Sequence, residues 1–376
     1  MNEIELRLAR LRELMKREHL SAFIFPSTDA HQSEYVADHW RGREWISGFN
    51  GSAGTAVVTM KSAALWTDSR YFLAAEEQLE GTEYQLMRLK IEGTPTIAEW
   101  LGKELQEVQS PEVGLDGMVN SYNYVKDLIY SLRKLGGITL RTNLDPLAQI
   151  WENRPSLPAN PVEIQPLEYA GETLASKVAR IRKSLRELHA DGMLVSALDN
   201  IAWTLNLRGT DVHCNPVFVS YLLIESGKVS LFVDDNKLSP EVKQYLQDNQ
   251  VSLYNYNKVE KCLESYSEYN ILLDGNETSY YLWKAVKCQE IVAAGSPIPA
   301  MKAVKNKAEI EGYHSAMLKD GVAMVKFLKW LKPAVEAGGQ TEISIDEKLT
   351  SLRAEQKLFR DISFDTIAGY AQHGAI

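Results

Sequence analysis

The sequence predicts an α/β protein in which two similar units follow one another and a third segment of different character follows both. The main observation is a repeat, because residues 8–19 match residues 178–189 without a gap at an offset of 170 (178 − 8). Further matches fall at an offset of 158 (203 − 45), which places an insertion of twelve residues in the first unit. These matched positions are Trp45, Phe49 and Gly51 against Trp203, Leu207 and Gly209.

Short apolar runs in corresponding places predict the strands of both units. The first unit has them over residues 22–25, 55–60 and 65–68, and the second over residues 193–195, 219–224 and 231–234. The last two runs of each unit are spaced like a hairpin. The glycine-rich stretch that precedes residue 55 lacks the Lys of a phosphate-binding loop and leads into a strand, so we interpret it as a tight turn.

Helices are predicted where apolar residues recur at helical spacing behind a capping residue. Residues 3–18 form one such helix, and its apolar face carries Ile4, Leu8, Leu11 and Met15. Others begin near Asp68, near Thr96 and at Ser239-Pro240, where the side chain before the helix can accept a free backbone N–H.

Four prolines predict an extended connector between the units, since proline fixes φ and cannot donate to a ladder. They are Pro155, Pro158, Pro161 and Pro166. We therefore expect a first domain over residues 1–157, a linker over 158–172 and a second domain over 173–299.

The third segment, residues 300–376, predicts two amphipathic helices and one strand. Residues 307–331 carry the first apolar stripe, Gly338-Gly339 interrupts the chain, and Ser344–Glu347 predicts a capping box that begins the second helix. Residues 362–367 read as a strand. Elements this few cannot bury their own apolar faces, so we expect the beginning of an incomplete domain.

Composition excludes several classes of function. The 376 residues carry a formal net charge of −9, whereas binding to nucleic acid normally needs a basic face. No apolar run is long enough to span a membrane, and the acidic N-terminal helix does not resemble a signal peptide. The three cysteines, Cys214, Cys262 and Cys288, are too few for a disulfide framework and are typical of a cytoplasmic protein.

Motifs in all three parts stand in the order of a known family. The first unit carries Asp29–Tyr35, Gly48–Thr55 and Trp66–Phe72; the second carries Ala197–Trp203, Asn206–Gly209 and Asn215–Phe218; the third carries Lys302–Asn306, Ser363–Ile367 and Gly374–Ile376. Together they resemble the three-domain aminopeptidases P, which are Xaa-Pro aminopeptidases. The resemblance covers nearly the whole chain.

The resemblance implies two tandem creatinase-N-terminal-like α/β domains with mixed sheets, plus the first helices and strand of a pita-bread α+β domain. It implies a cytoplasmic homodimer that releases the N-terminal residue preceding proline from peptide substrates. It further implies two divalent metals, usually manganese, held by two Asp, one His and two Glu. Two such cations lower the pKa of a shared water and polarise the carbonyl of the peptide bond.

In that family the metal ligands and a substrate-site His follow the Gly-Ala-Ile segment, which stands here at residues 374–376. We therefore expect no catalytic residue, no metal ligand and no bound manganese in this chain, and we predict that the chain alone is inactive. The alternative is a non-catalytic peptide- or partner-binding module, as in pita-bread relatives without metal ligands.

The residues themselves do not predict a local metal site. His213 and Cys214 are adjacent, and adjacent residues rarely ligate one ion well. Asp361 and Asp365 flank and enter the predicted strand, where they would lie about 13 Å apart by strand rise.

Glu34 and Arg70 are the candidate substrate-binding residues. A carboxylate can hold the free α-ammonium group of a peptide, and a guanidinium can hold a carboxylate or a carbonyl. The resemblance implies that loops of the first domain reach the mouth of the active site. The alternative for each residue is a salt bridge at the surface or between domains. In the second unit, we expect Arg208 to pair with a nearby Asp, either Asp199 or Asp211.

Overall fold

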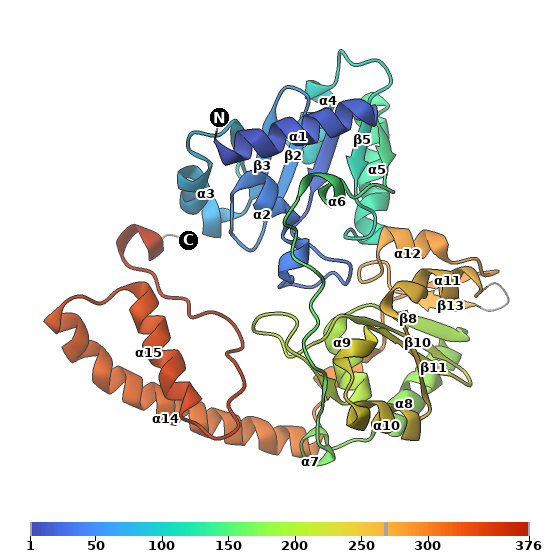
Figure 1. Ribbon diagram of the computed structural model, residues 1–376, viewed down its shortest axis with the longest axis vertical. Helices are drawn as coiled ribbons and strands as arrows, with labels where there is room; N and C mark the ends of the chain where they lie inside the picture. The colour runs from blue at the N-terminus through green and yellow to red at the C-terminus, as the bar shows by residue number, and fades with distance from the viewer. Residues whose placement is uncertain (1, 267–269, 375–376) are drawn as a thin grey trace.

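The computed structural model describes residues 2–266 and 270–374, and it contains two six-stranded mixed sheets with helices on both faces (Figure 1). The α/β class and the tandem repeat predicted from the sequence are confirmed. The third segment projects from the second unit, and its end returns towards the first unit (Figure 1).

The first sheet has the strand order β4-β3-β2-β1-β5-β6. Its middle strands are antiparallel neighbours, β1 with β2 and β2 with β3, whereas β4, β5 and β6 add parallel to their neighbours. The bounds are β1 Ala22–Phe25, β2 Thr55–Thr59, β3 Ala63–Thr67, β4 Tyr84–Arg88, β5 Glu112–Leu115 and β6 Thr139–Arg141.

The second sheet repeats this topology strand for strand, in the order β12-β11-β10-β8-β13-β14. Strand β8 occupies the place of β1, and the hairpin β10–β11 occupies that of β2–β3, with the same directions. The bounds are β8 Gly192–Val195, β10 Ser220–Glu225, β11 Val229–Val233, β12 Val251–Tyr254, β13 Ile271–Leu273 and β14 Ile291–Ala293.

Helices cover both faces of each sheet, so the central strands are buried on both sides, whereas the outer strands are partly exposed. In the first unit these are α1 Glu3–Arg17, α2 Gly42–Ser47, α3 Phe72–Leu79, α4 Ile97–Glu104, α5 Tyr122–Gly136 and α6 Leu147–Ile150. In the second they are α8 Leu174–Glu187, α9 Leu198–Leu205, α10 Pro240–Asp248, α11 Val259–Glu264, α12 Tyr280–Ala285 and α13 Ile298–Ala303. The predicted caps Thr96 and Ser239 each accept a backbone N–H of the following helix.

The remaining short elements connect these layers. A two-stranded sheet pairs β7 Glu163–Ile164 with β9 Leu207–Arg208, and α7 Leu167–Ala170 follows β7. The 3₁₀ helices are η1 Asp38–Trp40, η2 Ser69–Tyr71, η3 Asp235–Lys237, η4 Tyr256–Lys258 and η5 Ala371–Gly374. Within the described part of the chain, no helix is both long enough and apolar enough to cross a bilayer.

Backbone hydrogen bonds and a stacked aromatic pair join the two units. The Tyr122 N–H donates to the Thr278 carbonyl at 3.0 Å, and the Tyr280 N–H donates to the Asn120 carbonyl at 2.8 Å. The rings of Tyr122 and Trp283 stack with centroids 3.9 Å apart. This contact fixes the first sheet against the second, because hydrogen-bonded backbone cannot slide without leaving polar groups unpaired.

The third segment consists of α14 Lys307–Ala337 and α15 Glu342–Ala354, followed by irregular chain. Two predictions are wrong here. Residues 362–367 do not form a strand, because no strand of the described residues lies beside them to accept their hydrogen bonds. The second helix is capped by Thr341 rather than by Ser344, whose hydroxyl instead bonds back to the Thr341 N–H.

The apolar stripe of α14 is only partly covered. Ala323 and Phe327 pack against Leu349 and Leu352 of α15. Elsewhere along α14 the large apolar side chains are exposed, among them Ile310, Tyr313, Met317, Leu318, Val325 and Leu328. The expectation that these helices cannot bury their own apolar faces is therefore confirmed for the described residues.

Candidate functional site

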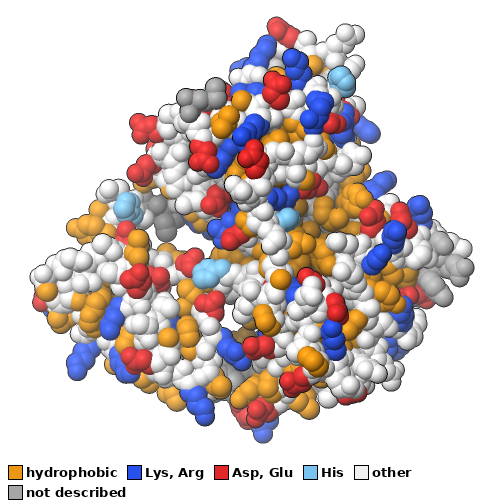
Figure 2. All heavy atoms as spheres, in the orientation of Figure 1, with side chains coloured by type: hydrophobic (Ala, Val, Ile, Leu, Met, Phe, Trp, Pro, Cys, Tyr) orange, Lys and Arg blue, Asp and Glu red, His pale blue; other side chains and the backbone are white. Residues whose placement is uncertain are grey.

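A cleft of about 210 Å³ lies where the first unit, the second unit and the third segment meet. Figure 2 shows this region as a hollow with acidic and histidine side chains around it. The first unit supplies most of the lining, including Glu34, Tyr35, Arg41 and Arg43; the second supplies His213, and the third supplies Asp365.

Glu34 is positioned by the loop that follows β1, and Asp29 organises this loop. The Asp29 carboxylate accepts the backbone N–H groups of His31 at 2.8 Å and Ser33 at 2.9 Å. His31 is buried in the second unit, where Nδ1 donates to the Ser196 carbonyl and Nε2 accepts from the Tyr256 hydroxyl, both at 2.9 Å. The chain is thus fixed on both units shortly before Glu34.

Arg43, on α2, also lines the cleft and fixes the glycine-rich turn beside it. Its guanidinium donates to the Phe49 and Gly51 carbonyls of the glycine-rich turn, and its Nε donates to the Ser27 hydroxyl at 3.1 Å. Burial lowers the pKa of Arg43 to about 10, so the side chain is still a cation at neutral pH. Since each of its three nitrogens donates to an oxygen of the first unit, Arg43 shapes the wall of the cleft.

The Glu34 carboxylate is the free charge of the cleft. It is exposed, and it makes no hydrogen bond or ion pair with any residue in 2–266 or 270–374. By contrast, Glu44 lies 3.8 Å from Arg41, which also pairs with Asp38 at 3.1 Å. Partial burial and the carboxylates of Glu34 and Asp365 raise the pKa of Tyr35, so its phenol remains a hydrogen-bond donor at neutral pH. Such a cleft suits a small cationic group.

Arg70 is not among the residues that line the cleft, although the charge of the Glu34 carboxylate acts on it. Its guanidinium makes a bidentate ion pair with Asp68, with both bonds at 2.8 Å. The Arg70 hydrogen bonds lower the pKa of Asp68, and the Arg70 side chain is more than half exposed. The structure therefore brings Glu34, but not Arg70, to the cleft.

The predicted pairing of Arg208 is wrong. Its guanidinium donates to the carbonyls of Ala202 at 3.1 Å and Leu207 at 2.8 Å, and helps to end α9. Asp211 instead pairs with Lys237 in the core of the second unit, while Asp199 pairs with Lys302. Sequence spacing favoured Arg208 because it is near in the chain, whereas Lys237 approaches only through the folded sheet.

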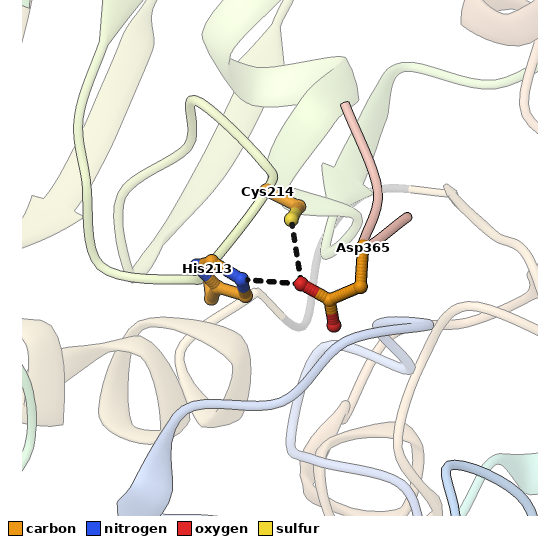
Figure 3. Close-up of side chains that lie close together, drawn as sticks. All are labelled: His213, Cys214 and Asp365. Atoms are coloured by element: carbon orange, nitrogen blue, oxygen red, sulfur yellow. Dashed lines mark hydrogen bonds and ion pairs between the residues drawn. The ribbon is translucent and has the colours of Figure 1, made fainter. Parts of the chain in front are cut away.

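One cluster of potential metal ligands occurs among the described residues, and it combines His213, Cys214 and Asp365 (Figure 3). The His213 Nε2 lies 3.0 Å from the Asp365 Oδ1, and the Cys214 Sγ lies 4.0 Å from the same oxygen. A dinuclear manganese centre would need more carboxylates and no thiol. The described residues do not fit such a centre, and we derive no catalytic step through it.

Sequence reasoning missed the roles of Tyr35, Arg43 and His213 in the cleft. Tyr35 adjoins Glu34, so proximity in the chain was a usable signal. Arg43 lies in no motif that predicts bonds to a glycine-rich turn, and His213 reaches the cleft only because the two units dock.

Comparisons with known proteins are consistent with this architecture. A family model described as the creatinase/prolidase N-terminal domain matches residues 7–140, and another of that description matches residues 153–309. The chain is 37% identical over 382 residues to "Xaa-Pro aminopeptidase ApepP" of Drosophila melanogaster, covering 98% of this chain and 62% of the relative. It is 36% identical over 387 residues to "Xaa-Pro aminopeptidase 1" of Dictyostelium discoideum, covering 99% and 61%.

Among solved structures, the chain is similar to the X-prolyl aminopeptidase of Caenorhabditis elegans, described as a cytosolic enzyme with a di-nuclear active site. The TM-score is 0.90 at 30% identity, over 98% of this chain and 62% of that one. The chain therefore spans about three fifths of the length of the relatives it matches.

Proposed function

We propose a function from one premise: the chain is a homologue of the Xaa-Pro aminopeptidases P and contains two creatinase/prolidase N-terminal domains. The protein acts as a metal-dependent Xaa-Pro aminopeptidase, releasing the N-terminal residue that precedes proline from a peptide. The observation that carries the proposal is similarity along 98% of the chain, including the cleft and both units around it.

Within this function, Glu34 binds the α-ammonium group of the substrate. Three features support this role: the carboxylate lines the cleft, it has no partner among the described residues, and the loop that carries it is anchored through Asp29 and His31. A charge-assisted bond to an ammonium group contributes roughly 1.5–3 kcal/mol, which corresponds to a tenfold or larger effect on affinity. Arg70 has a secondary role in this proposal, because it must first leave Asp68 to contact a ligand.

The remaining parts of the proposal are the sequence-based expectations, and the Caenorhabditis elegans neighbour, described as a cytosolic enzyme with a di-nuclear active site, supports the two metals and the cytoplasmic location. Two manganese ions serve the reaction, the protein is a cytoplasmic homodimer, and domain boundaries fall near residues 157, 173 and 300. The described residues lack the carboxylate-rich ligand set of a dinuclear centre, so we further propose that residues 1–376 alone have no peptidase activity. Incubation of this chain with Mn²⁺ and an Arg-Pro-Pro peptide tests that statement, and turnover at the rate of an intact aminopeptidase P would contradict it.

The test of the Glu34 assignment uses the intact protein and the variant Glu34→Gln. Glu80→Gln is the matched control, since Glu80 is an exposed carboxylate of the same unit at the end of α3, outside the cleft. We expect Glu34→Gln to raise KM for Arg-Pro-Pro at least tenfold, because the amide keeps the shape of the side chain but removes its charge. Glu80→Gln should leave KM unchanged.

An N-acetylated peptide separates binding of the amine from general damage. It lacks the ammonium group, so wild type should bind it at least tenfold more weakly than the free peptide, while Glu34→Gln should bind both equally. Equal preference in wild type would refute the role of Glu34. If the intact wild-type protein, supplied with metal, binds the free peptide more tightly than the acetylated one but hydrolyses neither, the result would favour the non-catalytic peptide-binding module.

A further inference from the structure

We propose that His213, Cys214 and Asp365 bind one Zn²⁺ ion, which fastens the third segment to a loop of the second unit beside the acidic cleft (Figure 3). This inference departs from the sequence-based expectation that the chain holds no metal. It concerns residues and a metal chemistry separate from the proposed dinuclear centre.

The turn that carries His213 and Cys214 explains how two adjacent side chains can serve one ion. Residues 212–215 form a tight turn closed by an antiparallel bridge, with the Asn215 N–H donating to the Val212 carbonyl at 3.3 Å. Cys214 has φ of 61°, in the left-handed region that non-glycine residues rarely adopt. In extended chain, neighbouring side chains point to opposite faces. Here the turn brings both towards Asp365.

The spacing of the three donor atoms is close to that of a tetrahedral zinc site. Zinc bonds of about 2.1 Å to nitrogen, 2.0 Å to oxygen and 2.3 Å to sulfur place the N···O pair about 3.4 Å apart and the S···O pair about 3.5 Å apart. The corresponding distances are 3.0 Å from His213 Nε2 and 4.0 Å from Cys214 Sγ to Asp365 Oδ1. All three donors lie within 4.8 Å of one another. A tetrahedral site would set the third pair, nitrogen and sulfur, about 3.6 Å apart, and that pair lies within 4.8 Å, so shifts of up to about 1.2 Å are needed for coordination.

Negative charge accumulates around the cluster. The Asp361 carboxylate lies 3.9 Å from the His213 Nδ1, on the side of the ring away from Asp365, and the carboxylate of Asp346 has a buried oxygen without a hydrogen-bond partner among the described residues. Burial, with the charges of Asp365, Asp361 and Asp346, raises the pKa of the Cys214 thiol to about 11. A cation reverses this effect because it stabilises the thiolate, so binding releases a proton and strengthens as the pH rises.

The donor set favours zinc over the hard cations. Mn²⁺, Mg²⁺ and Ca²⁺ prefer oxygen ligands, whereas one thiolate, one imidazole and one carboxylate suit the borderline Zn²⁺ ion. The competing explanation for the geometry is an ion pair between a protonated His213 and Asp365. An ion pair does not involve Cys214, so replacing its thiol should reduce metal binding only if the zinc site exists.

The test uses the protein with its thiols reduced by a phosphine, dialysed against limiting free Zn²⁺ and analysed for bound metal. Cys214→Ser is compared with Cys262→Ser, which removes another free cysteine of the same unit outside the cluster. We expect Cys214→Ser to bind one equivalent of zinc less than Cys262→Ser. With Co²⁺ in place of zinc, the thiolate-to-cobalt absorption band should appear in Cys262→Ser and vanish in Cys214→Ser.

Asp365→Asn is a second variant that tests the site even if Cys214→Ser fails to fold. The Asp365 side chain is 72% exposed, so its replacement should not affect folding. It should weaken zinc binding at least tenfold, while circular dichroism and thermal unfolding of the zinc-free protein stay unchanged. Equal zinc content in the two serine variants, or no cobalt band in Cys262→Ser, would overturn the proposal and leave the ion pair. No readout depends on peptidase activity, so failure here is independent of failure of the proposed function.

Discussion

Replacing His31 tests whether one buried imidazole fixes the first unit to the second. His31 belongs to the first unit but bonds to Ser196 and Tyr256 of the second, and its ring centroid lies 4.4 Å from that of Tyr221. His31→Ala removes two hydrogen bonds, each contributing about 1 kcal/mol, and ring packing of about 1–2 kcal/mol. We therefore expect the free energy of unfolding to fall by about 3 kcal/mol.

The stabilisation by His31 should also depend on pH. Burial, opposed by Asp29 and the Ser196 carbonyl and reinforced by Lys237, lowers the pKa of His31 below its ordinary value of 6.5. The unfolded chain therefore binds a proton that the folded chain does not bind until the pH is lower. Stability is fully present above pH 6.5 and falls between 6.5 and the lowered pKa, by about 1.4 kcal/mol per pH unit.

Urea unfolding at pH 7.5 and pH 5.5, followed by tryptophan fluorescence, measures both effects. His39→Ala is the control, since the His39 side chain is half-buried in the first unit and donates to the Pro155 carbonyl at 2.7 Å. The pH effect is measured as the difference in the free energy of unfolding between wild type and His31→Ala at each pH. This difference is needed because Asp116 and Glu277 have pKa values raised to about 7 and therefore stabilise the folded chain as the pH falls, opposite to His31. Equal losses in the two alanine variants, or a difference that does not shrink at pH 5.5, would refute the reasoning.

Two further predictions concern the cores of the units. Asp211→Asn leaves the buried Lys237 without its counter-ion and should lower the free energy of unfolding, measured by urea titration, by about 3 kcal/mol. The control Asp235→Asn removes a carboxylate from the exposed pair with Lys243 and should change the free energy of unfolding little. Equal effects of the two substitutions would contradict a buried ion pair. Gly54→Ala places a methyl group 2.9 Å from the Trp66 carbonyl oxygen and should therefore lower the melting temperature. The control Gly312→Ala adds a methyl group in open space on α14 and should leave the melting temperature unchanged or raise it. A Gly54→Ala variant with an unchanged melting temperature would contradict this packing.

Much of each unit could be predicted because its determinants are local. The apolar face of the first helix is buried through Leu8, Leu11 and Met15, as its spacing indicates. The strand over residues 22–25 has the predicted bounds, because four consecutive apolar residues end at a proline. The repeat at residues 8–19 and 178–189 indicated that the second sheet would copy the first, although the strand order itself came only from the structure.

The errors arose where a partner in space decides the outcome. Residues 362–367 have the composition of a strand but no strand beside them, so their backbone remains irregular. Arg208 has an acidic residue near it in the chain, yet Asp211 is neutralised by Lys237 across the fold. The left-handed turn at Cys214 and the approach of Asp365 to His213, on which the proposed zinc site depends, also come only from the structure.

The sequence by itself determined most of the helices and strands of the two units and that the units share one plan, because periodicity, caps and repeats act over a few residues. Only the tertiary structure decided which charges remain free and which are neutralised. Glu34 lines the cleft where three parts of the chain meet and has no partner among the described residues, whereas Arg70 is already paired with Asp68. Electrostatic pairing depends on the distance between charges in space and on the exclusion of water, and neither quantity can be predicted from the order of residues alone.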